Sequence, residues 1–440
     1  MKPDTRPIGI RGFLIDAPEY GTLRAIRDGA LLIEEGCITA YDSFEAVQAN
    51  HEGRDIRWRH SPEAVVIPGL VDLHTHLPQY PAVTRPSGTR QGTILENQFR
   101  VPIARVQSRA FFEDLIRHGT TSAVVHAATL ATSTETAFSA AEECGLRITM
   151  GKLMRDRARP EDPPPEASAE RSCAESEALC RKWHGRDAGR LEYVFSPQSL
   201  LTCTEPLFRQ VVGLANQHNA RIQTHHSEFP GEAESVRTLH PNPSGSVGFY
   251  ADCGLLGKQT LLAPCARLTA EEIDSLAASG AAVAHCPTAD FQRARGLLPL
   301  DRLRHAGVRI GLGSDVAGGS ELNLWQVMRS VITTQTARHY SDETLSIPSP
   351  AEALHLATQG GADALGKGSL IGSLDIGREA DLVVLDLAAL TPYGRKLNPH
   401  AHLDAADIIS LLVYRGGSQA VIETFVRGRS LHRAAAPLLV

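Results

Sequence analysis

Two histidines one residue apart close a long apolar run at residues 65–76. Side chains alternate between the two faces of a strand, so His74 and His76 are expected to point to the same side. Two imidazoles on one face are typical of half a metal site, whereas an isolated His-x-His can equally be a pair of surface histidines beyond a core strand. The choice depends on whether the rest of the chain supplies further ligands.

Two later apolar runs end in suitable side chains. His225 lies in Gln-Thr-His-His-Ser-Glu, and Asp315 ends Gly-Leu-Gly-Ser-Asp. Alone, His225 would be read as a hydrogen-bonded core histidine and Asp315 as the cap of a following turn. Together with His74 and His76 they give three imidazoles and one carboxylate, a set that can bind a single divalent ion and leave room for water. These ligand types suit Zn²⁺, and Fe²⁺ is possible.

A carboxyl group follows the third of these histidines. Glu228 lies three residues after His225, where it can face the ion without binding it. In that position a carboxyl can take a proton from the activated water and pass it to a substrate nitrogen, as a hydrolytic deamination requires. The alternative is a solvated loop glutamate like Glu232 and Glu234. We predict Glu228 as the general acid and base.

The elements that must position these residues are eight apolar strand candidates separated by helix-length amphipathic segments. The strands are predicted at residues 65–74, 121–125, 147–152, 191–197, 220–225, 259–264, 281–286 and 309–315. Eight βα units over about 250 residues are typical of a (β/α)₈ barrel of the TIM type, whose chemistry lies at the carboxyl ends of the strands. The predicted ligands end the first, fifth and eighth strands, so we expect them around one axis.

The two ends of the chain share a different sequence pattern, in which short strand-like runs of alternating residues are separated by turns. It occurs in the first 60 or so residues and returns after Gly372-Ser-Leu-Asp-Ile-Gly. We therefore predict a small β-sandwich built from both termini, formed by residues 1–66 and 371–440, around a metal-dependent barrel at residues 67–370.

Composition points to a small-molecule partner. The chain has 440 residues, a net charge of -6, and no long basic run, which argues against binding to nucleic acid or to a membrane surface. Its eight cysteines are scattered without Cys-x-x-Cys pairs, as expected for reduced thiols. The first residues show no apolar signal core, and no long uncharged apolar run occurs, so a cytoplasmic protein is expected.

Several motifs resemble those of the amidohydrolase superfamily, and most closely the branch of guanine deaminases and related aminohydrolases. They are Pro-Gly-Leu-Val-Asp-Leu-His-Thr-His-Leu-Pro-Gln-Tyr at 68–80, His-His-Ser-Glu at 225–228, His-Cys-Pro-Thr at 285–288 and Gly-Leu-Gly-Ser-Asp-Val-Ala-Gly-Gly at 311–319. The resemblance implies zinc ligands at His74, His76, His225 and Asp315, with Glu228 as general acid and base. It also implies that Asp315 helps to deprotonate the water, that Gln79 hydrogen-bonds a purine, and that the protein is a homodimer.

The chain departs from this family pattern in three places. Pro264 stands where the sixth strand of the family ends in a catalytic histidine, and proline has no side-chain group that could hold water. Gln198 and Ser199 stand where guanine deaminases carry an Arg-Phe pair that grips the base, and the tryptophan associated with the segment after Gln79 is absent. His226, His285 or a water could fill the space left by Pro264.

Three hypotheses follow. The first is a mononuclear zinc aminohydrolase that adds water to the amino-bearing carbon of guanine or a related heterocycle and releases ammonia. The second is an amidohydrolase that acts on another C–N bond or substituted heterocycle, with Gln198 and Ser199 in the substrate site. The third is a catalytically weakened paralogue, suggested by Pro264.

Overall fold

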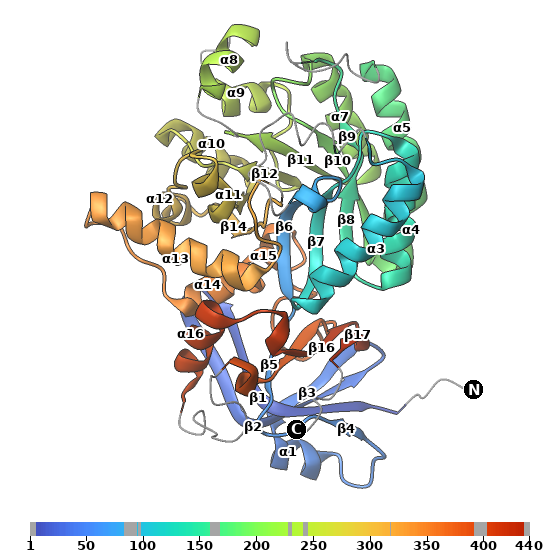
Figure 1. The fold of residues 1–440 in the computed structure, drawn as a ribbon, viewed down its shortest axis with the longest axis vertical. Helices are drawn as coiled ribbons and strands as arrows, with labels where there is room; N and C mark the ends of the chain where they lie inside the picture. Colours follow the sequence, from blue (N-terminus) through green and yellow to red (C-terminus); the bar gives the residue numbers. More distant parts are fainter. Residues whose placement is uncertain are drawn as a thin grey trace.

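Eight parallel strands form a nearly closed barrel in this computed structural model (Figure 1). The structure describes residues 6–82, 95, 98–158, 168–227, 231–240, 245–316, 318–390 and 403–434. The barrel strands are β6 (Leu70–His76), β7 (Thr120–His126), β8 (Arg147–Gly151), β10 (Leu191–Pro197), β11 (Arg221–His226), β12 (Thr260–Pro264), β13 (Ala282–His285) and β14 (Arg309–Leu312), and the short β9 (Leu153–Met154) pairs with β10. The predicted (β/α)₈ barrel is confirmed.

Backbone hydrogen bonds beyond the last strand close the barrel. The Asp315 amide donates to the carbonyl of His74 at 2.8 Å, and the His76 amide donates to the carbonyl of Val316 at 2.9 Å. These bonds join the chain after β14 to β6, the first barrel strand. The closure therefore places Asp315 beside the two histidines of β6.

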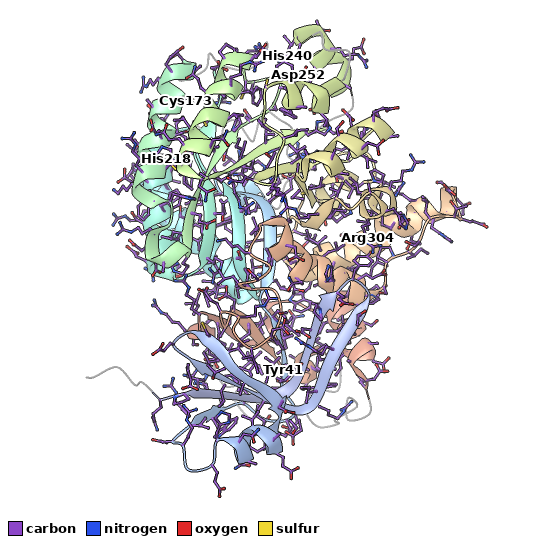
Figure 2. All side chains as sticks on the ribbon, turned by 180° about the vertical axis from the view of Figure 1, so that it is seen from behind. Tyr41, Cys173, His218, His240, Asp252 and Arg304 are labelled. Carbon is purple, nitrogen blue, oxygen red and sulfur yellow. The ribbon has the colours of Figure 1, made fainter. Side chains whose placement is uncertain are left out.

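Helices cover the outside of the barrel. They are α3 (Val101–Arg117), α4 (Ala131–Cys144), α5 (Ala169–Trp183), α6 (Arg186–Gly189), α7 (Glu205–His218), α8 (Glu232–Leu239), α9 (Gly245–Asp252), α10 (Ala270–Ser279), α11 (Pro287–Gln292), α12 (Leu300–His305), α13 (Leu324–Ser341), α14 (Pro350–Ala357) and α15 (Gln359–Ala364). Seen from behind, Cys173 and His218 mark α5 and α7 in this outer layer, whereas Tyr41 marks the smaller sheet (Figure 2). Within the described ranges, no helix combines the length and apolarity needed to cross a bilayer.

The smaller sheet takes strands from both ends of the chain, which lie side by side below the barrel in Figure 1. Its strands are β1 (Ile8–Glu19), β2 (Thr22–Glu34), β3 (Cys37–Ser43), β4 (Arg57–Arg59), β5 (Val65–Pro68), β15 (Leu382–Leu385), β16 (Val421–Val426) and β17 (Arg429–Arg433), with α1 (Phe44–Asn50) and α16 (Ala405–Arg415) beside them. The central β5 pairs with β1 on one side and with β15 on the other. The predicted boundary at residue 66 lies inside β5, and the division into 1–66, 67–370 and 371–440 stays a prediction.

A buried ion network joins this mixed sheet to the amino ends of the barrel strands. Arg147, which begins β8, binds Asp381 through Nε at 2.9 Å and also binds Glu379. Arg427 binds Glu379 at 2.9 Å and donates its backbone amide to Asp381 at 2.9 Å. The Arg147 side chain is 1% exposed, and its buried charge is balanced by these carboxylates.

Candidate metal centre and active site

His74 and His76 come from β6, which begins directly after a required glycine. A Cβ at Gly69 would meet the Thr121 side chain at 2.0 Å, and the apolar run divides at this glycine into β5 and β6. Strand alternation then turns His74 and His76 into the barrel mouth. Their side chains are 1% and 16% exposed. The pair is therefore almost enclosed, with His76 nearer to solvent.

His225, near the end of β11, is oriented by a backbone carbonyl. Its Nδ1 donates to the Gln198 carbonyl at 2.8 Å, and a carbonyl oxygen can only accept, so Nε2 is the nitrogen with the lone pair. That Nε2 lies 3.2 Å from Nε2 of His76. The ligand nitrogens of His74, His76 and His225 all lie within 4.8 Å of one another. The three predicted imidazoles thus form one cluster.

Asp315 approaches this cluster from the loop after β14. Its φ of 44° is a left-handed conformation that aspartate tolerates better than most residues. Gly318 allows the turn, because a Cβ there would lie 2.4 Å from Oδ2 of Asp315. Oδ1 of Asp315 lies 3.2 Å from Nε2 of His76 and 3.5 Å from Nε2 of His74. The fourth predicted ligand is therefore beside two of the imidazoles.

A buried arginine holds the other oxygen of this carboxylate. Nη1 of Arg295 donates to Oδ2 of Asp315 at 2.5 Å and lies 3.7 Å from Asp290. Burial alone would raise the pKa of Asp315, but the Arg295 charge and the contacts with His74 and His76 outweigh it and hold that pKa well below its usual range. Burial lowers the pKa of His74. The site therefore favours an ionised carboxylate beside a neutral imidazole.

A fourth imidazole, which was not among the predicted site residues, packs against the rings of this cluster. His126 ends β7 and is 1% exposed. Its ring is stacked on His225 with centroids 4.6 Å apart and on His76 with centroids 5.0 Å apart, and it meets the edge of His74 at 5.1 Å. Burial, followed by the charges of the three neighbouring rings, lowers the pKa of His126 well below its usual value.

The predicted substrate-binding residues have different surroundings. Oε1 of Gln79 and Oε1 of Gln198 are buried and have no hydrogen-bond partner in the part of the chain that the structure describes. Ser199 is buried in its own turn, where its Oγ accepts from the Leu201 amide at 3.3 Å and lies 3.3 Å from Oγ1 of Thr202. Glu228, the predicted general acid and base, lies outside the described residues.

The donor set fits a divalent cation. Nε2 of His74 is buried and has no hydrogen-bond partner within the described residues, and Nε2 of His225 faces another imidazole nitrogen. Lone pairs that converge in a dry site need a positive group between them. Imidazole nitrogen and carboxylate oxygen are donors that zinc and iron accept. The cluster can therefore hold a metal ion.

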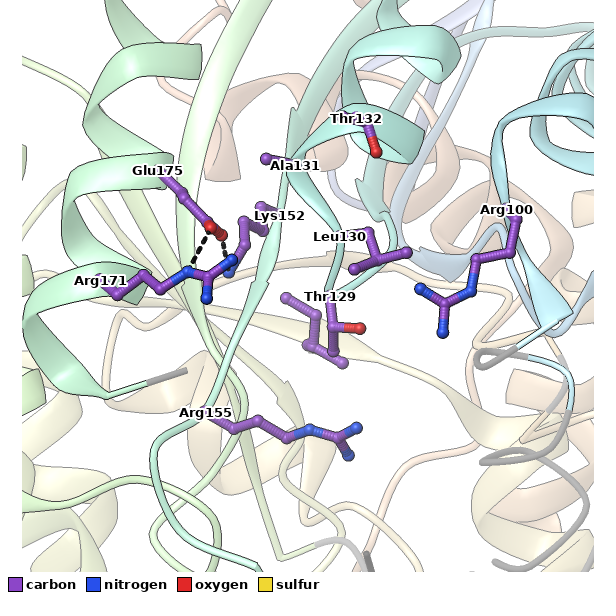
Figure 3. Close-up of a pocket in the computed structure, with 10 residues that line it drawn as sticks. Arg100, Thr129, Leu130, Ala131, Thr132, Lys152, Arg155, Arg171 and Glu175 are labelled. Carbon is purple, nitrogen blue, oxygen red and sulfur yellow. Dashed lines mark hydrogen bonds and ion pairs between the residues drawn. The ribbon is translucent and has the colours of Figure 1, made fainter. Parts of the chain in front are cut away.

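A cavity of about 320 Å³ lies at the same end of the barrel, beyond β7 and β9 (Figure 3). Its lining includes Thr129, three residues after His126, and the cationic Arg100, Lys152, Arg155 and Arg171. Glu175 pairs with Arg171 at 2.9 Å and lies 3.5 Å from Nζ of Lys152. Among the described lining residues positive charge exceeds negative charge, so a ligand group entering from this side meets a cationic wall.

Comparison with known proteins agrees with this architecture. A family model described as "Amidohydrolase family" matches residues 65–431. The chain belongs to the amidohydrolase family. The guanine deaminase of Escherichia coli (strain K12) is 31% identical over 436 residues, which cover 95% of this chain and 94% of that protein.

Solved structures show the same fold. The structure of E. coli guanine deaminase has a TM-score of 0.89 over 98% of this chain and 100% of that chain, at 28% identity. A guanine deaminase from C. acetobutylicum with bound guanine in the active site has a TM-score of 0.86, covers 97% of this chain and 100% of that chain, and is 23% identical. That second likeness concerns the fold alone.

This amidohydrolase has no imidazole at the end of β12. Pro264 is there, buried and paired in register with His226. His226 neighbours His225 on β11 and points the other way, with its ring 6.3 Å from that of Tyr250. His285 is buried, and burial together with the charge of Arg338 on α13 lowers its pKa to about 3. Neither histidine joins the imidazole cluster of this amidohydrolase.

Two features of the site were not among the residues predicted from strand ends, as the candidate metal ligands were. His126 had a signal, because a polar residue ends the apolar run of the second strand, but the predicted strand stopped one residue short at Val125. Arg295 and Asp290 belong to α11 and the loop after it, where no strand end marks them. The contact of Arg295 with Asp315 depends on the closed barrel.

Proposed function

We propose that the protein is a metal-dependent aminohydrolase that deaminates guanine or a related amino-substituted heterocycle. The observation that carries this proposal is the convergence of His74, His76, His225 and Asp315 at one end of the barrel. The 31% identity to the E. coli guanine deaminase over 95% of the chain supports the reaction class. Neither alternative, another C–N bond or a weakened paralogue, has comparable support.

The reaction exchanges an amino group for an oxo group. The oxygen of water bonds to the carbon that carries the amino group, the C–N bond breaks, and the amino group leaves as ammonia after gaining one proton from the water, while the other proton goes to the ring nitrogen. A bound divalent ion supplies a Lewis acid that makes water a better nucleophile at neutral pH. The protein must hold that water, accept its proton and return a proton to the departing nitrogen.

The residues of the chain divide this work. His74, His76 and His225 would hold the ion, with the Gln198 carbonyl fixing the tautomer of His225. Asp315 is kept ionised by Arg295 and can accept a proton from the water. We assign to Glu228 the transfer of that proton to a ring nitrogen, because it follows His225 by three residues.

Two amide oxygens suit the substrate. The side-chain oxygens of Gln79 and Gln198 are buried and lack a partner within the described residues, and such acceptors match the ring N–H groups of a purine. Ser199 contributes by shaping the turn that presents Gln198. We further assign zinc as the ion, and a cytoplasmic homodimer as the assembly, on the resemblance to guanine deaminases.

The test is a substrate screen on metal-replete protein. Protein purified without chelator is analysed for metal, and ammonia release is measured with guanine, other purines, pterins and triazines. We expect about one ion per chain and turnover of at least one of these substrates. Less than half an ion per chain, or no ammonia from any of them, would contradict the proposal.

Two further measurements address the alternatives. Mass spectrometry of the product distinguishes loss of ammonia from cleavage of another C–N bond. Pro264→His places an imidazole at the end of β12, and a large gain in turnover would indicate a weakened paralogue. Light scattering of the purified protein tests the homodimer.

A further inference from the structure

A buried carboxylate in β6 has no part in the reaction described above. Asp72 is fully buried and lies two residues before His74, so both side chains point to the same face of the strand. Oδ1 of Asp72 accepts from the His74 amide at 3.1 Å and from the Ser314 amide at 3.0 Å. Burial of a carboxylate is costly unless hydrogen bonds compensate it. One oxygen therefore joins the segment that carries His74 to the segment that carries Asp315.

These two segments meet where the barrel closes. β6 and β14 are the opposite ends of the strand order, and we call the contact between β6 and residues 313–316 the seam. Two backbone bonds cross the seam, one at each of the two β6 histidines. The bond from the Ser314 amide to Asp72 precedes them along the chain. Residues 314, 315 and 316 are thus all tied to β6, and the first of them is tied by a side chain.

The two backbones are in close contact at the seam. A Cβ at Gly313 would lie 2.9 Å from Cβ of His74 and 3.2 Å from its backbone nitrogen. Oδ1 of Asp315 lies 3.5 Å from Nε2 of His74, across the same seam. A small change in the separation of the two segments therefore changes the distance between these two candidate ligands.

We propose that Asp72 is a positioning residue of the metal centre. Its Oδ1 fixes the separation between His74 and Asp315, which lie on opposite sides of the seam, and it acts through the amides of His74 and Ser314. This inference rests on the proposed function, since it assumes the ion that those ligands would hold. It gives the aspartate of the Leu-Val-Asp-Leu-His-Thr-His segment a role distinct from that of the histidines.

A role in folding alone predicts a different result. If Asp72 served only to stabilise the barrel, its loss would lower the free energy of unfolding and leave the zinc affinity of the folded protein unchanged. If it positions the ligands, the folded protein should bind zinc more weakly, because the two sides of the seam no longer hold the spacing that the ion requires.

The test compares Asp72→Leu with Asp72→Asn. Leucine keeps the branched shape of the side chain and removes its acceptors, whereas asparagine keeps an amide oxygen that can accept from both amides. Thr260→Val is the matched control. Thr260 is buried at the start of β12 and donates through Oγ1 to the carbonyl of Leu255, so valine removes a buried hydrogen bond away from the seam.

Two readouts report on the ion site itself. Zinc affinity of the folded protein is measured by competition with a chromophoric chelator, and the visible spectrum of the cobalt-substituted protein reports the geometry of the ligands. We expect Asp72→Leu to bind zinc about 10–100-fold more weakly and to shift the cobalt bands. Asp72→Asn and Thr260→Val should match the wild type in both measurements.

A second variant covers the case in which Asp72→Leu does not fold. Gly313→Ala places a methyl group 2.9 Å from Cβ of His74 and should also weaken zinc binding, because it forces the seam apart. Wild-type zinc affinity and cobalt spectrum in either folded variant would overturn the inference and leave the proposed function intact. Equal losses in Asp72→Asn and Asp72→Leu would overturn it as well. A wild type that binds no zinc would instead refute the proposed function.

Discussion

The two ends of the barrel hold different kinds of buried polar group. At the carboxyl ends of the strands, Nε2 of His74 contacts Asp315, another candidate ion ligand, and the nitrogens of His126 and the side-chain oxygen of Gln79 are buried without a hydrogen-bond partner in the described part of the chain. At the amino ends, Arg147 is equally buried but binds Asp381 and Glu379. Unsatisfied polar atoms cost stability, and those beside the imidazole cluster lie where a bound ion or substrate can complete them.

The comparison predicts that substitutions at the two ends should have separable effects. Changes at the carboxyl ends should reduce ion binding and turnover more than stability. Changes at the amino ends should reduce stability and leave the activity per folded molecule unchanged.

The largest effect is expected from His225→Ala. This change removes the nitrogen that lies 3.2 Å from His76 Nε2, so the ion loses a ligand. We expect kcat/KM to fall by at least about 10³-fold, because transition-state charge is then poorly stabilised. Metal analysis and steady-state kinetics measure both losses. The neighbouring His226→Ala is the control and should retain the ion; equal loss of metal in both variants would contradict the assignment.

Arg147→Met tests the opposite end. It removes the cation that pairs with the buried Asp381 and leaves Glu379 with Arg427 alone, which should cost roughly 3–5 kcal/mol of unfolding free energy. Urea unfolding measures the loss, and kcat/KM of the remaining folded protein should match the wild type. Arg109→Met removes an exposed ion pair with Glu113 and should leave the unfolding midpoint unchanged. A loss of activity per folded molecule in Arg147→Met would break the proposed separation of the two ends.

Arg295→Met should have an intermediate effect at the carboxyl ends. Arg295 acts as a positioning residue, since it holds Oδ2 of Asp315 while Oδ1 faces His74 and His76. Loss of such a partner typically weakens metal binding by about 10–100-fold. The pKa of Asp315 should also rise, so activity should fall off at a higher pH on the acid side. An unchanged acid limb together with unchanged zinc affinity would show that Arg295 is only structural.

The smallest effect is expected from Glu423→Gln in the mixed sheet. Glu423 is buried and binds Arg59 at 2.6 Å and His60 at 2.8 Å. Burial raises its pKa, but the contacts with His60, Ser430 and Arg59 outweigh it and lower the pKa below the usual 4.5. A lowered carboxyl pKa stabilises the folded state above the unfolded-state pKa, and this stability is lost as pH falls through the folded value.

The unfolding free energy of the wild type should therefore exceed that of Glu423→Gln by about 1–3 kcal/mol at pH 7, the range for hydrogen bonds to a charged group. The difference should shrink below about pH 4.5, as the carboxyl takes up its proton. Urea unfolding from pH 7 to pH 4 measures this trend. A difference that stays constant over that range would contradict it.

Sequence patterns predicted the barrel because each buried strand is a short apolar run, and parallel strands bring their carboxyl ends to one place. The same logic brings His74, His76, His225 and Asp315 together in the structure. The strand-end rule did not include His126, because the predicted second strand ended at Val125, one residue before the end of β7.

Long-range contacts were beyond that logic. Arg295 and Asp315 are 20 residues apart, and their contact depends on how two loops pack after the barrel closes. The bonds that close the barrel, from the Asp315 amide to His74 and from the His76 amide to Val316, likewise join segments that are far apart in the sequence. No periodic signal marked either feature.

The position of β5 in the mixed sheet also constrains how the chain is made. β5 ends at Pro68, whereas its partner β15 begins at Leu382. At roughly 5–20 residues per second, synthesis of the intervening chain takes on the order of tens of seconds. During that time one edge of β5 has no partner, and the barrel can form before its base is covered. The strands that are synthesised last thus cover the free edge of β5. A chain truncated before β15 would leave that edge exposed, where it can pair with other chains and aggregate.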